Sequence, residues 1–440
     1  MTSSYPRPEV IPLESSPLPE RRIETIGDGV QATLVSAGVV PVTGLRLVVH
    51  AGSADVPEGM TWLDRYVHDY LMEGTEALEA GAFASALAEL GGHLSVSGDE
   101  HTTTLSTEVP SEHATEAVEL LVSAARTPRF PDGSAERLRD DLHRSRAVVS
   151  TQPGWLAHAA FRNALYAGHP YGTVLPTDEQ IDTFTTNAAR GFWEARAGGR
   201  NVRFMVAGMF DGDAILESAN RALSGWSGTP APAVSPPSTS SSRVVHYVER
   251  PGAEQSTLQM GLRVPAPGHE DYVPLEVLNS LLGGSFYSRI TLNIREDKGY
   301  TYSPRSAISS RPGDAYWAES ADVTTNVTGA SIREILGEIE RLRSEPPSED
   351  ELRGIINYVS GTFVLRQATP GGILNHLEFL DLHSLDTSYS ANYVARVRDV
   401  TPEEIQRLAQ QYLDPAAMPI VVVGDRAQVE EQVAEFGSPA

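Results

Sequence analysis

The feature that most constrains the fold of this chain is an order of elements that occurs twice, on either side of a stretch without charge. That stretch, TPAPAVSPPSTSSS (Thr229 to Ser242), is almost entirely Pro, Ser, Thr and Ala, a composition typical of an extended linker. On each side the first strand has alternating hydrophobicity, in GLRLVVHAG (Gly44 to Gly52) and TLQMGLRVPAPG (Thr257 to Gly268). Each side closes with an apolar strand that ends in glycine, VRFMVAG (Val202 to Gly208) and MPIVVVG (Met418 to Gly424). A duplicated pattern predicts two similar domains rather than one continuous core.

Between its strands each half has two helical segments, a further strand and a long helix. We therefore predict an α+β fold made of two homologous α/β-sandwich domains that arose by tandem duplication. The N-terminal domain is expected at 22–228, the linker at 229–242 and the C-terminal domain at 243–437. A chain of 440 residues is long enough for two such cores.

Two local patterns refine this prediction. The alternation in the first strand places Leu45, Leu47 and Val49 on one face. Ser134 and Ser348 each precede a long helical pattern and are predicted to be its N-cap.

The charge balance narrows the classes of partner. The formal net charge of −24 would repel a nucleic-acid backbone and attract a cationic partner or a basic peptide. No apolar run approaches the roughly 20 residues that span a bilayer, and the N-terminal stretch lacks the apolar segment of a signal peptide. We expect a cytoplasmic protein that binds neither nucleic acid nor membrane. The chain has no cysteine, which excludes disulfides and thiolate metal sites.

A helical stretch in the first half, LDRYVHDYLMEGT (Leu63 to Thr75), has the frame of a zinc-peptidase helix. Together with LGGHLSVSGDEHTTTLST and LLGGSFYSRITLNIREDKGYTYS, it resembles the pitrilysin/insulinase family of inverted-motif zinc metallopeptidases, which includes the mitochondrial processing peptidase. The resemblance runs from about Arg22 to Gly437. It implies a two-domain unit that forms half of a clamshell. In that family the helix carries His-x-x-Glu-His, whose histidines bind zinc and whose glutamate is the general base.

Aligned on the Gly-Thr turn, this chain has different residues at all three motif positions. Arg65 stands at the first histidine, His68 at the glutamate and Asp69 at the second histidine. The family's third ligand is a glutamate on a later helix, and the matching window, LHRSRAVVSTQP (Leu142 to Pro153), holds no carboxylate. The motif occurs nowhere else among the 12 histidines. We therefore predict no metal and no catalytic residue in this chain alone.

Two interpretations of the altered helix remain open from the sequence. His68, Asp69, His101 and His143 are a conceivable set of ligands for a different metal cluster. Arg65 and Asp69, four residues apart, are instead spaced for an ion pair on an ordinary helix, and we favour this second interpretation.

The second half retains another part of the family pattern. Arg295 and Tyr302 match the family's Arg-Glu-x-x-Gly-x-x-Tyr motif, and Gly283 and Gly284 fit the glycine-rich turn before it. The resemblance implies that this pair holds the substrate backbone near the scissile bond of a zinc site in an opposite domain. The competing interpretation is a surface ion pair of Arg295 with Asp297 and a Tyr302 that is half buried in a strand.

A substrate clamp without a metal site indicates a chain that works with another one. The resemblance implies the zinc-less, non-catalytic subunit of a heterodimeric zinc metalloendopeptidase. Its partner would be a homologous subunit with zinc on an intact His-x-x-Glu-His, and its substrate a peptide, possibly a basic one. Family resemblance also makes Gly92 to Ser97 the strand on which substrate adds. The alternatives are a structural scaffold or peptide-binding protein derived from a peptidase, and a stand-alone hydrolase with a rearranged site.

Overall fold

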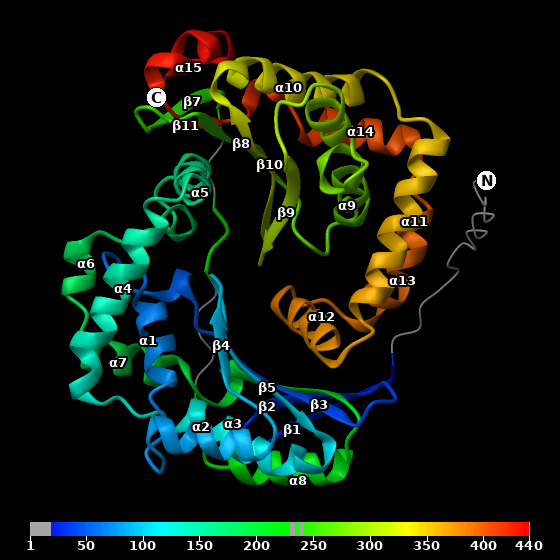
Figure 1. The fold of residues 1–440 in the computed structure, drawn as a ribbon. Helices are drawn as coiled ribbons and strands as arrows, with labels where there is room; N and C mark the ends of the chain where they lie inside the picture. Colours follow the sequence, from blue (N-terminus) through cyan, green and yellow to red (C-terminus); the bar gives the residue numbers. More distant parts are fainter. Residues whose placement is uncertain (1–18, 229–233, 238–241, 440) are drawn as a thin grey trace, which may run out of the picture.

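The chain folds into two α+β halves, each built on one six-stranded sheet (Figure 1). A computed structural model describes residues 19–228, 234–237 and 242–439. The first half contains β1 (Arg21–Ile26), β2 (Val30–Ser36), β3 (Val42–Val49), α1 (Leu63–Leu71), α2 (Ala80–Glu89), β4 (Ser95–Gly98), β5 (Thr103–Pro110), α3 (Ala114–Arg126), α4 (Ala135–Val149), α5 (Pro153–Leu165), α6 (Asp178–Asp182), α7 (Thr186–Arg196), β6 (Val202–Gly208) and α8 (Gly212–Leu223).

The second half contains β7 (Val244–Glu249), β8 (Gln255–Val264), α9 (Tyr272–Asn279), the π-helical turns η6 (Ser280–Gly284) and η7 (Thr291–Asp297), β9 (Arg305–Arg311), β10 (Asp314–Thr324), α10 (Thr328–Ser344), α11 (Glu349–Arg366), α12 (Pro370–Leu382), α13 (Thr387–Arg398), α14 (Pro402–Tyr412), β11 (Ile420–Gly424), α15 (Arg426–Val433) and β12 (Ser438–Pro439). No helix in these described ranges is long and apolar enough to cross a bilayer.

The predicted duplication is visible in the strand orders. The first sheet runs β1-β2-β6-β3-β5-β4 and the second β12-β7-β11-β8-β10-β9, so five strands of each sheet have a counterpart at the same position. The edge strands differ, because β1 begins its half and is antiparallel to β2, whereas β12 ends its half and is parallel to β7. In both sheets one inner pair is parallel, β2 with β6 and β7 with β11, and the pairs that follow are antiparallel. The α+β prediction is therefore confirmed. The predicted linker, 229–242, falls mostly outside the described residues, which omit 229–233 and 238–241.

The alternating residues of β3 share one face, as predicted, and the structure shows that this face is buried. Leu45, Leu47 and Val49 are fully buried in the core of the first half. Val48, on the opposite face, is also buried, but in a separate cluster that includes residues of the second half. Both faces of the strand are therefore covered, and the second cover comes from a distant part of the sequence.

The two halves exchange helices. Helix α12 of the second half lies on the first sheet, where Ile373, Leu374 and Leu377 pack against Val48 and its neighbours. Helix α5 of the first half lies on the second sheet, where Phe161 and Tyr166, for example, belong to one buried cluster with strand residues of the second half. Figure 1 shows both helices beside the sheet of the opposite half. This exchange makes the two domains a single packed unit.

Charged groups reinforce the exchange. Arg46 of β3 pairs with Glu378 of α12 at 2.6 Å, and Arg203 of β6 pairs with Asp381 of α12 at 2.7 Å. On the other side, Glu100 binds Arg162 and the second half's Arg311, each at 2.8 Å. Burial raises the pKa of Glu100, but the two guanidinium groups outweigh it and lower that pKa to about 2.

Both serines stand at the predicted N-cap positions, but only one of them caps its helix with its side chain. The Ser348 hydroxyl accepts a hydrogen bond from the backbone N–H of Glu351 at 3.3 Å, as an N-cap does. The Ser134 side chain makes no cap bond, because its hydroxyl donates to the Glu73 carboxylate at 2.5 Å instead. A tertiary partner on another segment has replaced the local one.

Candidate functional site

Helix α1, which carries the altered zinc motif, begins at a strained residue. Trp62 precedes the helix with φ +74°, a left-handed conformation that costs a bulky residue about 1–3 kcal/mol. It is almost fully buried, and its indole N–H donates to the Val174 carbonyl at 3.0 Å. The indole ring also lies under the Arg65 guanidinium, 4.3 Å from ring centroid to Cζ. This conformation therefore fixes the residue at the first histidine position.

Arg65 makes aromatic contacts and not the predicted ion pair. Besides Trp62, its guanidinium is 5.9 Å from the Trp155 ring of α5. Within the described part of the chain no carboxylate oxygen lies within 4.0 Å of Arg65, so the predicted pair with Asp69 is wrong. Arg65 contacts the two indole rings rather than Asp69, because a flat, weakly hydrated cation stacks well on indole faces.

His68 is held as a neutral hydrogen-bond donor. Its Nε2 lies 2.9 Å from the Thr103 hydroxyl, which itself donates to the Ala51 carbonyl at 2.7 Å. Because the hydroxyl's one proton is committed to Ala51, His68 must carry its own proton on Nε2. Burial, followed by the charge of Arg65, lowers the pKa of His68 to about 4. The imidazole therefore acts neither as a carboxylate-like base nor through Nε2 as a metal ligand.

The edge strand approaches this imidazole closely. A Cβ on Gly98 of β4 would lie 2.5 Å from Cε1 of His68, so only glycine fits there. Strand β4 pairs on one side with β5 and forms the edge of the first sheet. It includes the last three residues of the segment, Gly92 to Ser97, that the resemblance identifies with substrate addition.

Arg65, His68 and Asp69 line a cavity of about 1150 Å³ between α1, β4, α4 and α5. From α4 the cavity receives Leu142 and Ser145, which offer no carboxylate. The pKa of Asp69 is raised to about 6. Burial is the largest cause, the charge of Asp141 adds to it, and the charges of Arg137 and Arg65 oppose it. At the three motif positions, the Arg65 guanidinium cannot bind a metal ion and the Nε2 atom of His68 already donates a hydrogen bond. Only the Asp69 carboxylate is left, which is fewer than the three ligands that catalytic zinc requires. The residues present therefore do not fit the family's metal.

The alternative metal cluster does not form. His101 is bonded to the Tyr171 hydroxyl at 2.7 Å, and His143 lies between Asp178 and Asp182, 3.0 Å from each. In the described ranges no group of three or more His, Asp or Glu residues is arranged to hold a metal ion. The four residues considered from the sequence are thus used separately.

Arg295 and Tyr302 are brought together in the second half. The Arg295 guanidinium contacts two rings, with its Cζ 4.5 Å from the centroid of Phe286 and 4.9 Å from that of Tyr302. Its Nε contacts Glu296 at 3.2 Å, so the predicted alternative partner Asp297 is wrong. Tyr302 is 80% exposed and not half buried in a strand. The pair is thus pre-arranged at the surface, with the phenol free to reach another molecule.

The sequence analysis missed the aromatic residues that surround this pair. Phe286 and Tyr287 are exposed by 54% and 77%, and their rings meet edge to face at 5.4 Å. Together with Arg295 and Tyr302 they form a surface that we call the clamp patch. The signal in the sequence was the adjacent pair Phe286 and Tyr287 just after the glycine-rich turn. Neighbouring aromatic residues that are exposed are uncommon outside interaction sites, so the pair indicates such a site.

Two family models match the chain over most of its length. The model of the insulinase family (peptidase family M16) matches residues 34–177. The model of the peptidase M16 inactive domain matches residues 183–359. The chain belongs to the insulinase family of peptidases, M16, and its sequence lacks that family's catalytic motif.

Related proteins and structures agree with this assignment. The chain is 21% identical over 371 residues to the uncharacterized zinc protease SCO5738 of Streptomyces coelicolor, covering 83% of this chain and 81% of that protein. It is 24% identical over 292 residues to the uncharacterized zinc protease YmxG of Bacillus subtilis, covering 65% and 69%.

Among solved structures, a protease from Helicobacter pylori superposes with a TM-score of 0.86 at 18% identity, covering 92% of this chain and 100% of that one. The peptidase M16 inactive domain from Pseudomonas fluorescens superposes with a TM-score of 0.86 at 20% identity, covering 92% and 98%. A chain of complex III2 from Candida albicans reaches a TM-score of 0.78 at 14% identity, covering 94% and 99%. These likenesses establish the fold.

Proposed function

We propose that this chain is the non-catalytic subunit of a heterodimeric zinc metalloendopeptidase. It completes the peptide chamber and supplies Arg295 and Tyr302 to the zinc site of a homologous partner with an intact His-x-x-Glu-His. The observation that carries the proposal is the contrast between the two halves. The zinc helix has residues that do not fit the metal, while Arg295 lies 4.9 Å from the ring of Tyr302, whose side chain is 80% exposed. The Arg295 side chain itself is 24% exposed.

The geometry of Arg295 suits the clamp role. Its guanidinium carbon lies close to the rings of Phe286 and Tyr302 and its Nε contacts Glu296, so in this proposal the Nη groups are the donors that meet a peptide carbonyl. A donor held in position before the substrate arrives loses little conformational freedom on binding. In this proposal the zinc and all bond-breaking chemistry belong to the partner.

The net charge of the chain indicates the kind of substrate that the proposed complex binds. The net charge of −24 supports a basic peptide as the substrate and opposes nucleic acid. A cytoplasmic location without membrane attachment is part of the same proposal.

A second candidate is a structural scaffold or peptide-binding protein without a hydrolytic role. It is supported by the shared fold of the Candida albicans complex III2 chain, which shows that the architecture is also used inside a large assembly. The exposed clamp patch favours the first candidate, because a scaffold has no need to keep Arg295 stacked and accessible.

The test is affinity capture of this chain from its native lysate, followed by reconstitution with the captured partner. We expect a homologous chain of similar length with His-x-x-Glu-His. In the reconstituted complex, Arg295→Ala should lower kcat for peptide hydrolysis by roughly 10²–10³-fold, as removal of one transition-state donor does. Arg426→Ala, which removes an exposed guanidinium paired with Glu430, is the matched control.

Two results would contradict the proposal. Capture without any zinc-bearing homologue would exclude the heterodimer. Full activity of the Arg295→Ala and Tyr302→Phe complexes would leave only the scaffold role.

A further inference from the structure

We propose that the second half contains a binding pocket for a cationic group, an ammonium or a guanidinium. This pocket is the counterpart of the altered zinc cleft and has about 540 Å³ of volume. Helices α9, α11 and α12 and strand β9 line it, in the positions that α1, α4, α5 and β4 occupy around the first cleft. The duplication has thus produced two clefts, each with its own chemistry. This inference concerns a site beyond the proposed subunit role.

Aromatic rings form the walls of this pocket. Phe363 and Tyr393 are stacked, with centroids 4.0 Å apart and an angle of 16°. Phe379 and Tyr389 contact each other at 5.9 Å and line the same space. Cations bind the faces of such rings, with a gain of about 0.5–2 kcal/mol that grows as water is excluded.

A carboxylate lies at the same pocket. Glu276 of α9 lines it, and among the described residues its one hydrogen-bond donor is the Tyr393 hydroxyl, at 3.0 Å. Gln367 also lines the pocket, and its Oε1 is buried without a donor. Two acceptors with capacity to spare, next to aromatic faces, match a ligand that brings N–H donors and positive charge.

The groups around Glu276 do not neutralise it. Arg366 of α11 is exposed at the pocket, and no ion pair within the described ranges joins it to Glu276. Burial, followed by the charge of Arg21, lowers the pKa of His376 on α12 to about 4, so this imidazole is neutral. Tyr272 of α9 and Tyr389 and Tyr393 of α13 are neutral phenols whose pKa values burial raises.

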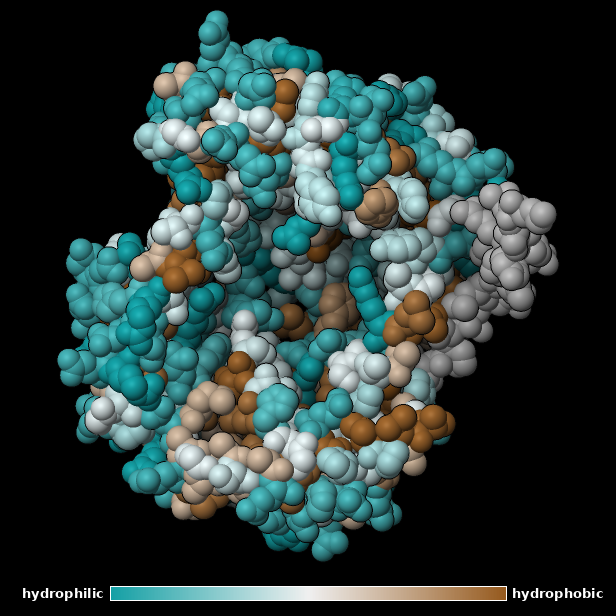
Figure 2. Space-filling view, viewed as in Figure 1, coloured by the Kyte–Doolittle hydropathy of each residue, from teal (hydrophilic) through white to brown (hydrophobic). Residues whose placement is uncertain are grey.

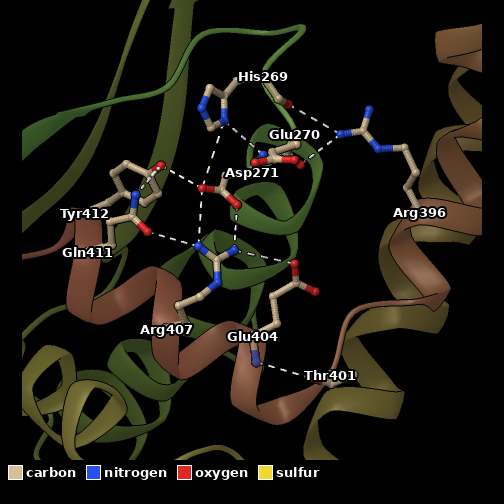
Figure 3. Close-up of polar contacts among 9 residues, drawn as sticks. All are labelled: His269, Glu270, Asp271, Arg396, Thr401, Glu404, Arg407, Gln411 and Tyr412. Carbon is tan, nitrogen blue, oxygen red and sulfur yellow. Dashed lines mark hydrogen bonds and ion pairs between the residues drawn. The ribbon is translucent and has the colours of Figure 1, made fainter.

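The second cation whose charge acts on Glu276, Arg396, is committed elsewhere. Arg396 of α13 donates to the backbone carbonyl of Glu270 at 2.9 Å (Figure 3). The same figure shows Asp271, at the start of α9, accepting from Arg407 at 2.6 Å and from Tyr412 at 2.7 Å. These bonds hold the helix that carries Glu276, so the carboxylate is presented from a fixed wall.

Two residues that line the pocket lie close along the chain to the clamp patch. Figure 2 shows that the molecule is hollowed between the two halves. Gly284 lines the pocket two residues before Phe286 of the clamp patch, and Ser306 lines it four residues after Tyr302. A peptide held at the clamp patch therefore passes close to the pocket, while a small amine needs no peptide to enter it.

Isothermal titration of the full chain with three probes tests the proposal. The first probe is agmatine. The second is a pentapeptide with a central arginine flanked by glycines, acetylated at its N-terminus and amidated at its C-terminus. The third is the same pentapeptide with neutral citrulline in place of the arginine. At pH 8 we expect the arginine peptide or agmatine to bind at least 10-fold more tightly than the citrulline peptide. If agmatine binds as tightly as the arginine peptide, the ligand of the pocket is a free amine. A peptide at least 10-fold tighter than agmatine indicates a basic side chain.

Variants with opposite expected signs make the test sharper. Glu276→Gln should weaken cation binding at least 10-fold, and Arg366→Gln should strengthen it, because one removes attraction and the other repulsion. Burial raises the pKa of Glu276 to about 7, so binding should also be weaker at pH 5.5 than at pH 8. Glu89→Gln, an exposed carboxyl of α2, is the control.

Equal binding of the arginine and citrulline peptides, or unchanged binding by Glu276→Gln with an intact unfolding transition, would overturn the site. Arg295→Ala should leave agmatine binding unchanged. Failure of the subunit proposal and failure of the cation pocket are therefore distinguishable.

Discussion

At the residue scale, three substitutions have turned a metal-binding helix into a packed one. Arg65 is stacked on Trp62, and His68 donates to Thr103. Arg65 and His68 each have a partner that suits their chemistry, so zinc binding here would require new ligands and also the release of these contacts. The loss of the motif is structural as well as chemical.

The buried imidazole of His68 makes folding sensitive to acid. Its pKa is about 4 in the folded chain, against about 6.5 in an unfolded one, so below pH 6.5 the unfolded state takes up more protons. This contribution to stability is complete above pH 6.5 and is lost as the pH falls toward 4. His68→Gln, which keeps an N–H donor, should reduce the loss in urea midpoint between pH 7 and pH 5.

The matched control is His93→Gln, because His93 is exposed. It should leave the pH dependence of the urea midpoint as it is in the natural chain. An unchanged slope in His68→Gln would show that this imidazole does not titrate on unfolding as proposed.

At the scale of elements, the exchanged helices explain why strands of both sheets are buried on both faces. The helices of the same half cover one face, and α5 or α12 of the opposite half covers the other. Helix α12 buries Leu374 against β3, where a Cβ on Gly44 would lie 2.9 Å from the Leu374 Cδ1 atom. The strand and the helix are separated by more than 300 residues in sequence, yet one glycine fixes their approach.

This contact predicts a coupled pair of variants. Leu374→Ala should lower the free energy of unfolding by about 2–5 kcal/mol through a cavity. Gly44→Ala alone should cost about 1–3 kcal/mol through overpacking. In the Leu374→Ala background the cost of Gly44→Ala should largely disappear, which a double-mutant cycle from denaturant unfolding measures.

Two matched variants control for side-chain size. Leu365→Ala removes a leucine that is 72% exposed, and Gly337→Ala adds a methyl to α10 with no atom within 4 Å. Both should be nearly neutral or, for Gly337→Ala, slightly stabilising. Strictly additive costs in the cycle would mean that α12 does not pack on β3 at this glycine.

At the scale of the whole molecule, the two halves depend on each other for charge as well as for packing. Glu100 is the one carboxylate shared by Arg162 and Arg311, which are both 3% exposed and come from different halves. Removal of that carboxylate leaves two buried guanidinium groups facing each other.

Glu100→Gln should therefore lower the free energy of unfolding by about 3–5 kcal/mol, as the breaking of buried ion pairs does. In the natural chain the pKa of Glu100 is held near 2, so its contribution is present above about pH 4.5 and is lost as the pH falls toward 2. Urea unfolding followed by tryptophan fluorescence measures the change.

The control for this prediction is Glu430→Gln, which breaks an exposed pair with Arg426 and should cost about 1 kcal/mol or less. A second transition in Glu100→Gln would show that the halves unfold separately without the shared carboxylate. A stability equal to that of the natural chain would show that the Arg162–Glu100–Arg311 contact contributes nothing.

The sequence by itself determined the features that depend on local order and residue type. The alternation in β3 was enough to place Leu45, Leu47 and Val49 on one face of the strand, which the structure shows to be buried. The repeat of elements predicted two sheets, and the side-chain chemistry at positions 65, 68 and 69 was enough to exclude the family's zinc ligands. Such conclusions need only neighbours along the chain, because strand periodicity and ligand chemistry are local properties.

Only the tertiary structure decided what those residues do instead. Arg65 is far in sequence from Trp155, and Glu276 is 117 residues from Tyr393. No local pattern predicts such contacts, because they depend on which helix is laid on which sheet. The exchange of α5 and α12, the stacked Arg295 and the second cleft all follow from that arrangement.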